Sequence, residues 1–282
     1  MRQRCVVVRV VSIMLLAAPP RLATAQAAAP VLPASGQAVF PVFEGWYRNP
    51  DGTFSLSFGY FNRNTKEVVD VPLGAGNVIT PNMGGQLQPT HFEPRRHWGV
   101  FAVTVPADFG KQKLTWTLTV RGETYAIPGS LRAEWQIDAL EGEVGSGNTP
   151  PALRFAATGP AGSGPGGMTS GPLEAMVGQP LSLTVWATDD GRSPTVTESA
   201  KTASAPQTSL TWFVHQGPAA ATFSAPVAKV PAAGGSASTT VTFATPGSYV
   251  LRVRANDQSG VAGAGHAQCC WTNGYVRVTV SR

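Results

Sequence analysis

Apolar and polar residues alternate along much of this chain, and the clearest case lies between Pro246 and Asp257. After the Pro-Gly turn, the odd positions from Tyr249 to Ala255 are apolar, whereas the even positions from Ser248 to Arg254 are mostly polar. Successive side chains of a β-strand point to opposite faces. The pattern therefore predicts a strand with one buried face.

The same period of two recurs in both halves of the chain, with no convincing helical period between. It predicts strands at 42–48, 53–61, 101–105, 114–120 and 125–127, then at 181–185, 210–214, 239–243 and 276–280. The turn Asn49-Pro50-Asp51-Gly52 joins the first two of these strands. We therefore predict an all-β fold with two β-sandwich domains in tandem.

Residues 1–25 have the features of a secretory signal peptide. Arg2 and Arg4 precede a mostly apolar run, and Ala23-Thr24-Ala25 has the small residues of a cleavage site. The run is too short and too broken to span a membrane. We therefore expect an exported protein, periplasmic or secreted.

Composition divides the remainder of the chain. Residues 26–38 are rich in Ala and Pro and predict a disordered lead-in. Residues 142–172 contain nine Gly and five Pro and predict a linker, within which Leu153-Arg154-Phe155 could be pinned to a neighbouring domain. The linker separates an N-terminal sandwich, 39–141, from a second sandwich, 173–282.

The second sandwich resembles PKD-type and related immunoglobulin-like modules of exported bacterial proteins. The resemblance rests on the runs Leu183–Gly191, Leu210–Trp212, Gln216–Pro218 and Pro246–Val253, with Asp257 after them. It implies a seven-strand Greek-key sandwich with Tyr249 at a corner and Trp212 in the centre. A long insertion at 194–207 and a long loop after Asp257 depart from the pattern.

The first sandwich is similar to regions of uncharacterised exported bacterial proteins, in the stretches Phe43–Tyr47 and Gly59–Asn64. That similarity implies no activity. These stretches do contain candidate saccharide ligands, because aromatic faces together with amide groups suit sugar rings. The candidates are Trp46, Tyr47, Tyr60, Asn62 and Asn64; the alternative is that some of them are core residues.

Charge excludes one class of partner. The formal charge of +5 for the whole chain includes four arginines of the signal peptide, and without them it is about +1. Nucleic-acid binding requires a dense positive face. We expect no nucleic-acid partner.

Cys269 and Cys270 are adjacent, and they are the two cysteines left once Cys5 is removed with the signal peptide. Exported proteins meet oxidising conditions. The pair can form a disulfide within an eight-membered ring, remain as thiols or bridge to another chain, or bind a metal together with His266. The first arrangement would stiffen the loop at 258–273.

Two further clusters could bind metal. His91, Glu93 and His97 lie beside two arginines and could hold a divalent metal or a small anion, or perform acid–base chemistry; the alternative is a polar sheet edge. Asp189, Asp190 and Asp257 follow predicted strands and could bind Ca²⁺. Carboxylates in turns explain the first two equally well.

The chain contains no nucleophile elbow, zinc-protease helix, phosphate loop or dinucleotide fingerprint. We therefore interpret it as a non-catalytic binding or scaffold protein of the bacterial envelope, with an envelope protein or glycan as partner and no cofactor. The alternative is a metal-dependent periplasmic enzyme, or a metal- or redox-handling protein, that uses the histidine or cysteine cluster.

The signal peptide gives the first testable prediction. Cleavage after Ala25 leaves a mature chain that begins at Gln26. Intact-mass analysis and N-terminal sequencing of the exported protein should both show this end. An exported chain that keeps Met1 would contradict the prediction.

Overall fold

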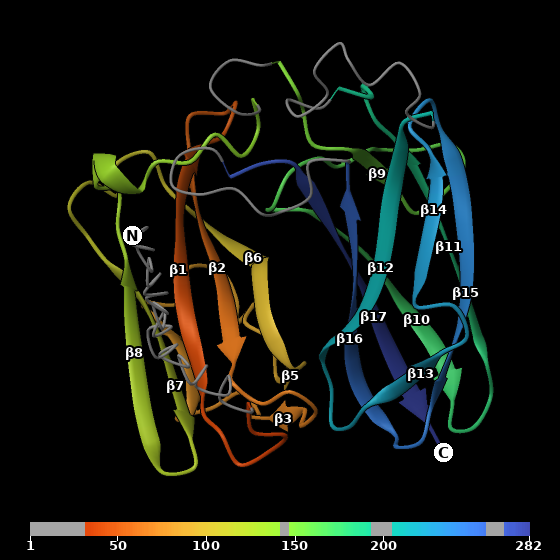
Figure 1. The fold of residues 1–282 in the computed structure, drawn as a ribbon, viewed down its shortest axis with the longest axis horizontal. Helices are drawn as coiled ribbons and strands as arrows, with labels where there is room; N and C mark the ends of the chain where they lie inside the picture. The colour runs from red at the N-terminus through yellow and green to blue at the C-terminus, as the bar shows by residue number, and fades with distance from the viewer. Residues whose placement is uncertain (1–31, 142–146, 193–204, 258–267) are drawn as a thin grey trace, which may run out of the picture. The chain divides into compact units, whose positions relative to one another are not determined.

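A computed structural model describes residues 32–141, 147–192, 205–257 and 268–282. Apart from a single 3₁₀ turn, η1 (Ala133–Trp135), the regular elements in these ranges are β-strands (Figure 1). The all-β prediction is confirmed. Within the same ranges there is no helix with the length and apolar character needed to cross a membrane.

The first sandwich consists of two three-stranded sheets and a short strand pair. One sheet has the order β1-β2-β6, with β1 (Val39–Arg48), β2 (Phe54–Asn62) and β6 (Arg95–Val105). The other has the order β4-β7-β8, with β4 (Asn77–Thr80), β7 (Leu114–Val120) and β8 (Glu123–Gly129), while β3 (Val69–Asp70) pairs with β5 (His91–Phe92). The alternating apolar positions meet between the sheets, where Phe58, Phe101 and Trp116 are fully buried.

The second sandwich has a five-stranded and a four-stranded sheet. The larger has the order β10-β17-β16-β12-β14, with β10 (Met168–Met176), β17 (Trp271–Ser281), β16 (Gly247–Asn256), β12 (Gln207–Gln216) and β14 (Val227–Pro231). The smaller has the order β13-β15-β11-β9, with β13 (Ala221–Phe223), β15 (Gly235–Phe243), β11 (Leu181–Thr188) and β9 (Ala152–Arg154). The chain crosses between the sheets from β11 to β12 and from β15 to β16, as immunoglobulin-like sandwiches do.

The residues that carried the resemblance lie as it implied. The Tyr249 hydroxyl donates to the Thr245 carbonyl at 2.9 Å, which is a tyrosine corner. Trp212 belongs to the core and stacks on Phe223. Leu183, Val185 and Leu251 pack in the same core. The described sandwich has nine strands rather than the seven that the resemblance implies, because β9 and β10, which begin in the Gly/Pro-rich stretch, join its two sheets. The narrower likeness to PKD modules stays a prediction.

Two strands come from the Gly/Pro-rich stretch between the predicted domains. β9 pairs antiparallel with β11, and β10, which begins at Met168, pairs parallel with β17. Leu153 is fully buried in the core of the second sandwich. This part of the stretch therefore belongs to the second sandwich rather than running free beside it.

Strand β6 contains a bulge where it contacts the second sandwich. Phe58 pairs with Phe101 and Tyr60 with His97, so the three residues between them on β6 oppose Gly59 alone. A bulge releases backbone groups from the ladder and turns them in a new direction. Here the carbonyls of Gly99 and Val100 accept hydrogen bonds from the second sandwich.

Four side chains of β16 and β17 bond to these two carbonyls. Trp271 Nε1 and Asn273 Nδ2 donate to the Gly99 oxygen at 3.0 and 2.9 Å. The Tyr275 hydroxyl and Arg252 Nη1 donate to the Val100 oxygen at 3.1 and 3.3 Å. The two sandwiches are therefore joined through specific polar contacts between a strand and a sheet face.

The contact covers the polar face of β16 only in part. Ser248 is exposed and Arg254 is half-buried, as the prediction of a half-buried strand requires, but Arg252 on the same face is buried. Arg252 has 2% of its surface exposed, and its guanidinium carbon lies 4.4 Å from the centre of the Phe213 ring. Arg254 lies 5.5 Å from the same ring. The alternation marked one face of β16 as polar, but it could not show that the first sandwich covers Arg252 on that face.

The loop before β5 extends the contact. His215 Nε2 lies 2.7 Å from the Leu87 carbonyl, and Gln216 Nε2 donates to the carbonyls of Gln86 and Gln88. The Thr90 backbone N–H donates to the His215 carbonyl at 2.9 Å. Both sandwiches thus belong to one compact unit of the described chain.

Gly99 gives a test of this junction. A Cβ at this position would overlap the Trp271 indole, and the residue has a φ of 51°. Gly99→Ala should lower the free energy of unfolding by about 1–3 kcal/mol, the usual range for overpacking. Urea unfolding of the two proteins measures the difference.

Gly76→Ala is the matched control, because the nearest atom to a Cβ there is Thr119 Cβ at an ordinary 3.7 Å. Equal losses of stability in the two variants would show that the contact with Trp271 is unimportant.

Candidate functional site

A polar cleft of about 710 Å³ lies where the first sandwich, the Gly/Pro-rich stretch 147–172 and the second sandwich meet. The β1–β2 turn and β2 supply Asn49, Thr53 and Ser55, and β6 supplies Thr104. Thr149 comes from the linker stretch, and Thr188, Asp189 and Asp190 come from the end of β11. Hydroxyl, amide and carboxylate groups therefore line the cleft from both sides.

Short hydrogen bonds order the walls of the cleft. Asn49 Nδ2 donates to Thr53 Oγ1 and Ser55 Oγ, both at 2.9 Å. On the opposite wall Asp190 Oδ2 accepts from the Thr149 backbone N–H and hydroxyl at 3.0 and 2.8 Å. These bonds fix the polar groups before any ligand arrives, which reduces the entropy lost on binding.

Asp189 is the electrostatically unusual residue of the cleft. Its Oδ2 accepts from the Gly191 N–H at 3.1 Å, while its Oδ1 is buried without a hydrogen-bond partner among the described residues. Burial raises the pKa of Asp189 to about 6, and the nearby charges of Asp257 and Asp190 add to that shift. A perturbed carboxylate in a cleft is a frequent mark of a functional site.

Tyr47 forms part of the cleft wall although only 4% of it is exposed. Its hydroxyl accepts the Gly166 backbone N–H at 2.9 Å, which ties β1 to the linker stretch. Burial raises the pKa of Tyr47 to about 12. This residue holds the two sides of the cleft together.

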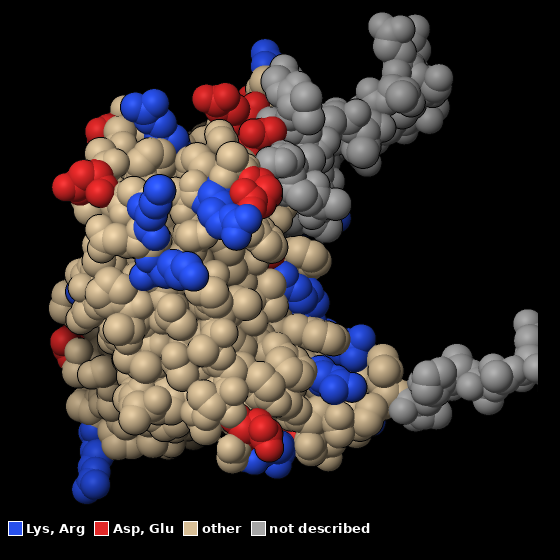
Figure 2. Space-filling model, turned by 90° about the vertical axis from the view of Figure 1, so that its left-hand side faces the viewer, with Lys and Arg blue, Asp and Glu red and all other residues tan. Residues whose placement is uncertain are grey.

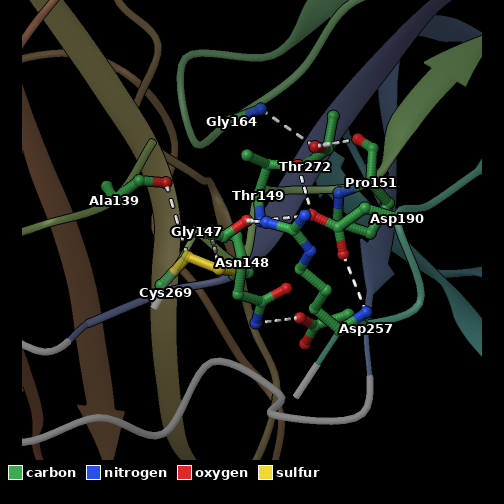
Figure 3. The surroundings of a disulfide bond; sticks show 12 residues. Ala139, Gly147, Asn148, Thr149, Pro151, Gly164, Asp190, Asp257, Cys269 and Thr272 are labelled. Carbon is green, nitrogen blue, oxygen red and sulfur yellow. Dashed lines mark hydrogen bonds between the residues drawn. A yellow bond between two sulfur atoms is a disulfide. The ribbon is translucent and has the colours of Figure 1, made fainter. Parts of the chain in front are cut away.

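The two cysteines lie close to the residues that support the cleft. Cys269 and Cys270 form a disulfide across a cis peptide bond, and both are buried. Their sulfur atoms lie 3.9 Å from the Ala139 carbonyl oxygen and 3.7 Å from that of Asn148 (Figure 3). Of the three arrangements that the sequence allowed, the structure contains the vicinal disulfide.

Figure 3 also shows how the surrounding loops are held. Asn148 Nδ2 donates to Asp257 Oδ2 at 2.7 Å, and the Gly164 N–H donates to the Thr272 hydroxyl at 2.9 Å. The start of β17 is thereby fastened to the stretch that lines the cleft. Asp257 lies near Asp189. Within the described ranges, neither Asp257 nor the two carboxylates that follow β11 belong to a cluster suited to a metal ion.

The histidine cluster is only partly assembled. His91 Nδ1 lies 2.6 Å from Asp70 Oδ1, and His91 Nε2 lies 3.8 Å from Glu93 Oε1. His97 instead packs between the Tyr60 and Phe213 rings, where burial and the charge of Arg252 lower its pKa to about 3. The described residues form no group of three metal ligands here, and His266 lies outside them.

Four of the five residues considered for a saccharide platform are buried. Tyr47 and Tyr60 are 4% and 2% exposed, and Asn62 and Asn64 are fully enclosed. Asn62 Nδ2 donates to the carbonyls of Glu67 and Phe92, while Trp46 donates from Nε1 to the Arg132 carbonyl. Their burial corrects the platform interpretation, because the strand pattern could not separate core aromatics from accessible ones.

Charged side chains are spread over the surface of the first sandwich between broad uncharged areas (Figure 2). The cleft depends instead on uncharged hydroxyl and amide groups beside its carboxylates. Asn49, Thr53, Ser55 and Thr149 were missed by the sequence reasoning. Their only signal was position, in a turn and in the linker, where polar residues are ordinary.

No protein-family model and no curated protein matches the chain. Solved structures align at low similarity. The D00–D0 domains of intimin cover 86% of this chain and 100% of their own, at 13% identity and a TM-score of 0.25. Domains 4 and 5 of the S-layer protein SbsC cover 87% and 98%, at 12% identity and a TM-score of 0.22.

WR4, a C. elegans MSP family member, covers 38% of this chain and 92% of its own, at 9% identity and a TM-score of 0.22. TM-scores in this range carry no argument about the function of this chain.

The raised pKa of Asp189 predicts a pH-dependent stability. Between about pH 4 and pH 6 the folded protein keeps a proton that the unfolded chain releases, so the free energy of unfolding falls as pH rises. Asp189→Asn removes the titrating group and with it this decrease. The free energy of unfolding of the variant minus that of the wild type should therefore increase from pH 4 to pH 6 and stay constant above pH 7.

Urea unfolding at pH 4, 5, 6, 7 and 8 checks the prediction, because groups that do not interact with Asp189 titrate alike in the two proteins and cancel in the difference. A gain that is the same at every pH would contradict it.

Proposed function

We propose that this chain is an exported, non-catalytic binding protein of the bacterial cell envelope that receives a polar ligand in the cleft between its sandwiches. The observation that carries the proposal is the construction of the cleft. Its hydroxyl, amide and carboxylate groups come from both sandwiches and the linker stretch, and internal hydrogen bonds order them.

The junction between the sandwiches supports the proposal. A cleft shared by two domains keeps its shape only where the domains do not move relative to each other. The bonds to the carbonyls of Gly99 and Val100 and the tie from Tyr47 to Gly166 restrict that motion. The second sandwich is thus a wall of the binding site and not merely a spacer.

The composition of the lining favours binding over catalysis. Asp190 accepts bonds from Thr149 and from the Arg192 backbone, and Asp51 accepts bonds from Thr53. These carboxylates are engaged in ordering their own loops. The signal peptide and the disulfide support a site outside the cytoplasm.

A co-sedimentation experiment tests the proposal. The mature protein is mixed with peptidoglycan sacculi or with outer-membrane vesicles, and the bound fraction is measured after centrifugation. Thr104→Arg places a long side chain in the cleft from an exposed position on β6. We expect binding to one envelope fraction and a loss of at least about five-fold in this variant.

Thr279→Arg is the control, because Thr279 is exposed on β17 and does not line the cleft. It adds the same charge and bulk elsewhere. Absence of binding to both fractions, or an equal loss in the two variants, would refute the proposal.

A further inference from the structure

A second pocket is lined by the first sandwich and by Gln268, which precedes β17 of the second, and it shares no lining residue with the cleft. Its volume is about 330 Å³. That is near the lower end of the usual range for small-molecule sites, which are mostly apolar with a few placed polar groups. The residues that matter for its chemistry are Phe43, Glu44, Arg96, Trp98, Trp135 and Gln268.

Aromatic rings form the apolar walls of this pocket. Trp135, on the 3₁₀ turn η1, is 45% exposed, and its ring centre lies 5.6 Å from that of the buried Phe43. Trp98 comes from the β6 bulge and is partly exposed. The aromatic surface that the sequence suggested near Trp46 is thus provided by other residues.

A compensated ion pair lies at the polar side of the pocket. Arg96 Nη2 donates to both carboxylate oxygens of Glu44 at 2.8 Å, and the Arg96 guanidinium carbon lies 3.8 Å from the centre of the Trp98 ring. Gly59 makes room for the pair, since a Cβ there would overlap Glu44 Oε1. Burial raises the pKa of Glu44 to about 7, so the two charges compensate each other fully above neutral pH.

Gln268 supplies an acceptor that the described residues leave unused. Its Nε2 donates to the Glu44 carbonyl at 3.0 Å, which fixes the orientation of the amide. Its Oε1 is buried and has no hydrogen-bond partner within the described ranges, and the residue is 6% exposed. A buried acceptor without a donor costs about 1–3 kcal/mol, so a donor at this place would stabilise the bound state.

From these groups we propose that the pocket binds one ring of a neutral saccharide. Indole faces contact the C–H face of a sugar ring, and hydroxyl groups donate to Gln268 Oε1. Arg96 is compensated by Glu44, and Glu134, which also lines the pocket, is compensated by Arg132, so an anionic or a cationic ligand is disfavoured. The inference concerns a site separate from the cleft and does not depend on the function proposed for the cleft.

Saturation-transfer NMR tests this assignment at pH 8. The probes are tri-N-acetylchitotriose, maltotriose and cellotriose as neutral sugars. A chitosan trimer with quaternary trimethylammonium groups, which stay charged at pH 8, is the cationic counterpart, and a hyaluronan tetrasaccharide is the anionic one. At least one neutral probe should receive saturation. Trp135→Ala and Gln268→Met should each weaken its binding by about ten-fold, the loss expected for about 1.4 kcal/mol.

Two control variants separate this site from other effects. Trp186→Ala removes a partly exposed indole from the second sandwich, and Thr104→Arg obstructs the cleft; both should leave the affinity unchanged. Unfolding midpoints of all four variants show whether each protein remains folded. A purely structural role of Gln268 would lower its midpoint without changing the affinity of the folded protein, and would overturn the assignment of its acceptor.

Three outcomes would overturn the saccharide assignment. These are no transfer to any neutral probe, transfer that Trp135→Ala leaves intact, and a preference for a charged probe. Loss of binding in Thr104→Arg alone would place the saccharide in the cleft instead.

Discussion

The contact between the two sandwiches depends on two neighbouring carbonyl oxygens of β6 that accept hydrogen bonds from the second sandwich. Gly99 and Val100 lie in the β6 bulge, and each accepts two side-chain hydrogen bonds from the second sandwich. If the sandwiches separated, these donors and acceptors would need water as a hydrogen-bond partner. Each group that stayed buried without a partner would destabilise the protein by about 1–3 kcal/mol. The contact therefore determines orientation as well as adhesion, because hydrogen bonds restrict geometry far more than apolar contact does.

The same bulge organises both candidate ligand sites. On one side it directs backbone acceptors toward Trp271 and Arg252, which holds the second sandwich where it can form a wall of the cleft. On the other side it carries Trp98 into the smaller pocket, beside the ion pair of Arg96 with Glu44. Gly59 opposite the bulge and Gly99 within it are required by close approach, so two small residues support a large part of the architecture.

Alternation of apolar positions predicted the all-β class and most long strands, since burial between two sheets imposes a period of two. It missed short strands such as β3 and β9, whose few residues have no pattern of their own. Tyr249 and Trp212 could be placed because the runs around them resemble those of immunoglobulin-like modules. The cleft could not be predicted, because its groups come from distant segments that only the junction brings together.

Burial also separated residues that looked alike in sequence. Tyr60 and Asn62 have the composition of a sugar site yet satisfy internal bonds, whereas Trp135 gave no comparable signal and is accessible. The pattern predicted that Arg252 faces solvent. In the structure, the Phe213 ring of its own sheet and the Val100 carbonyl of the first sandwich enclose it. Local pattern reports which face of a strand is polar; it does not report what covers that face.

The enclosed arginine has a consequence for how variation in this protein should be interpreted. A substitution at Arg252 or Asn273 looks harmless if each sandwich is considered as an independent module, since both residues lie outside either hydrophobic core. In the joined molecule both residues are buried, and a substitution there leaves a hydrogen-bonding group of the other sandwich without its partner. The structural unit is therefore the pair of sandwiches, and exchanging one of them would require a matching change in the strands of the other that form the contact.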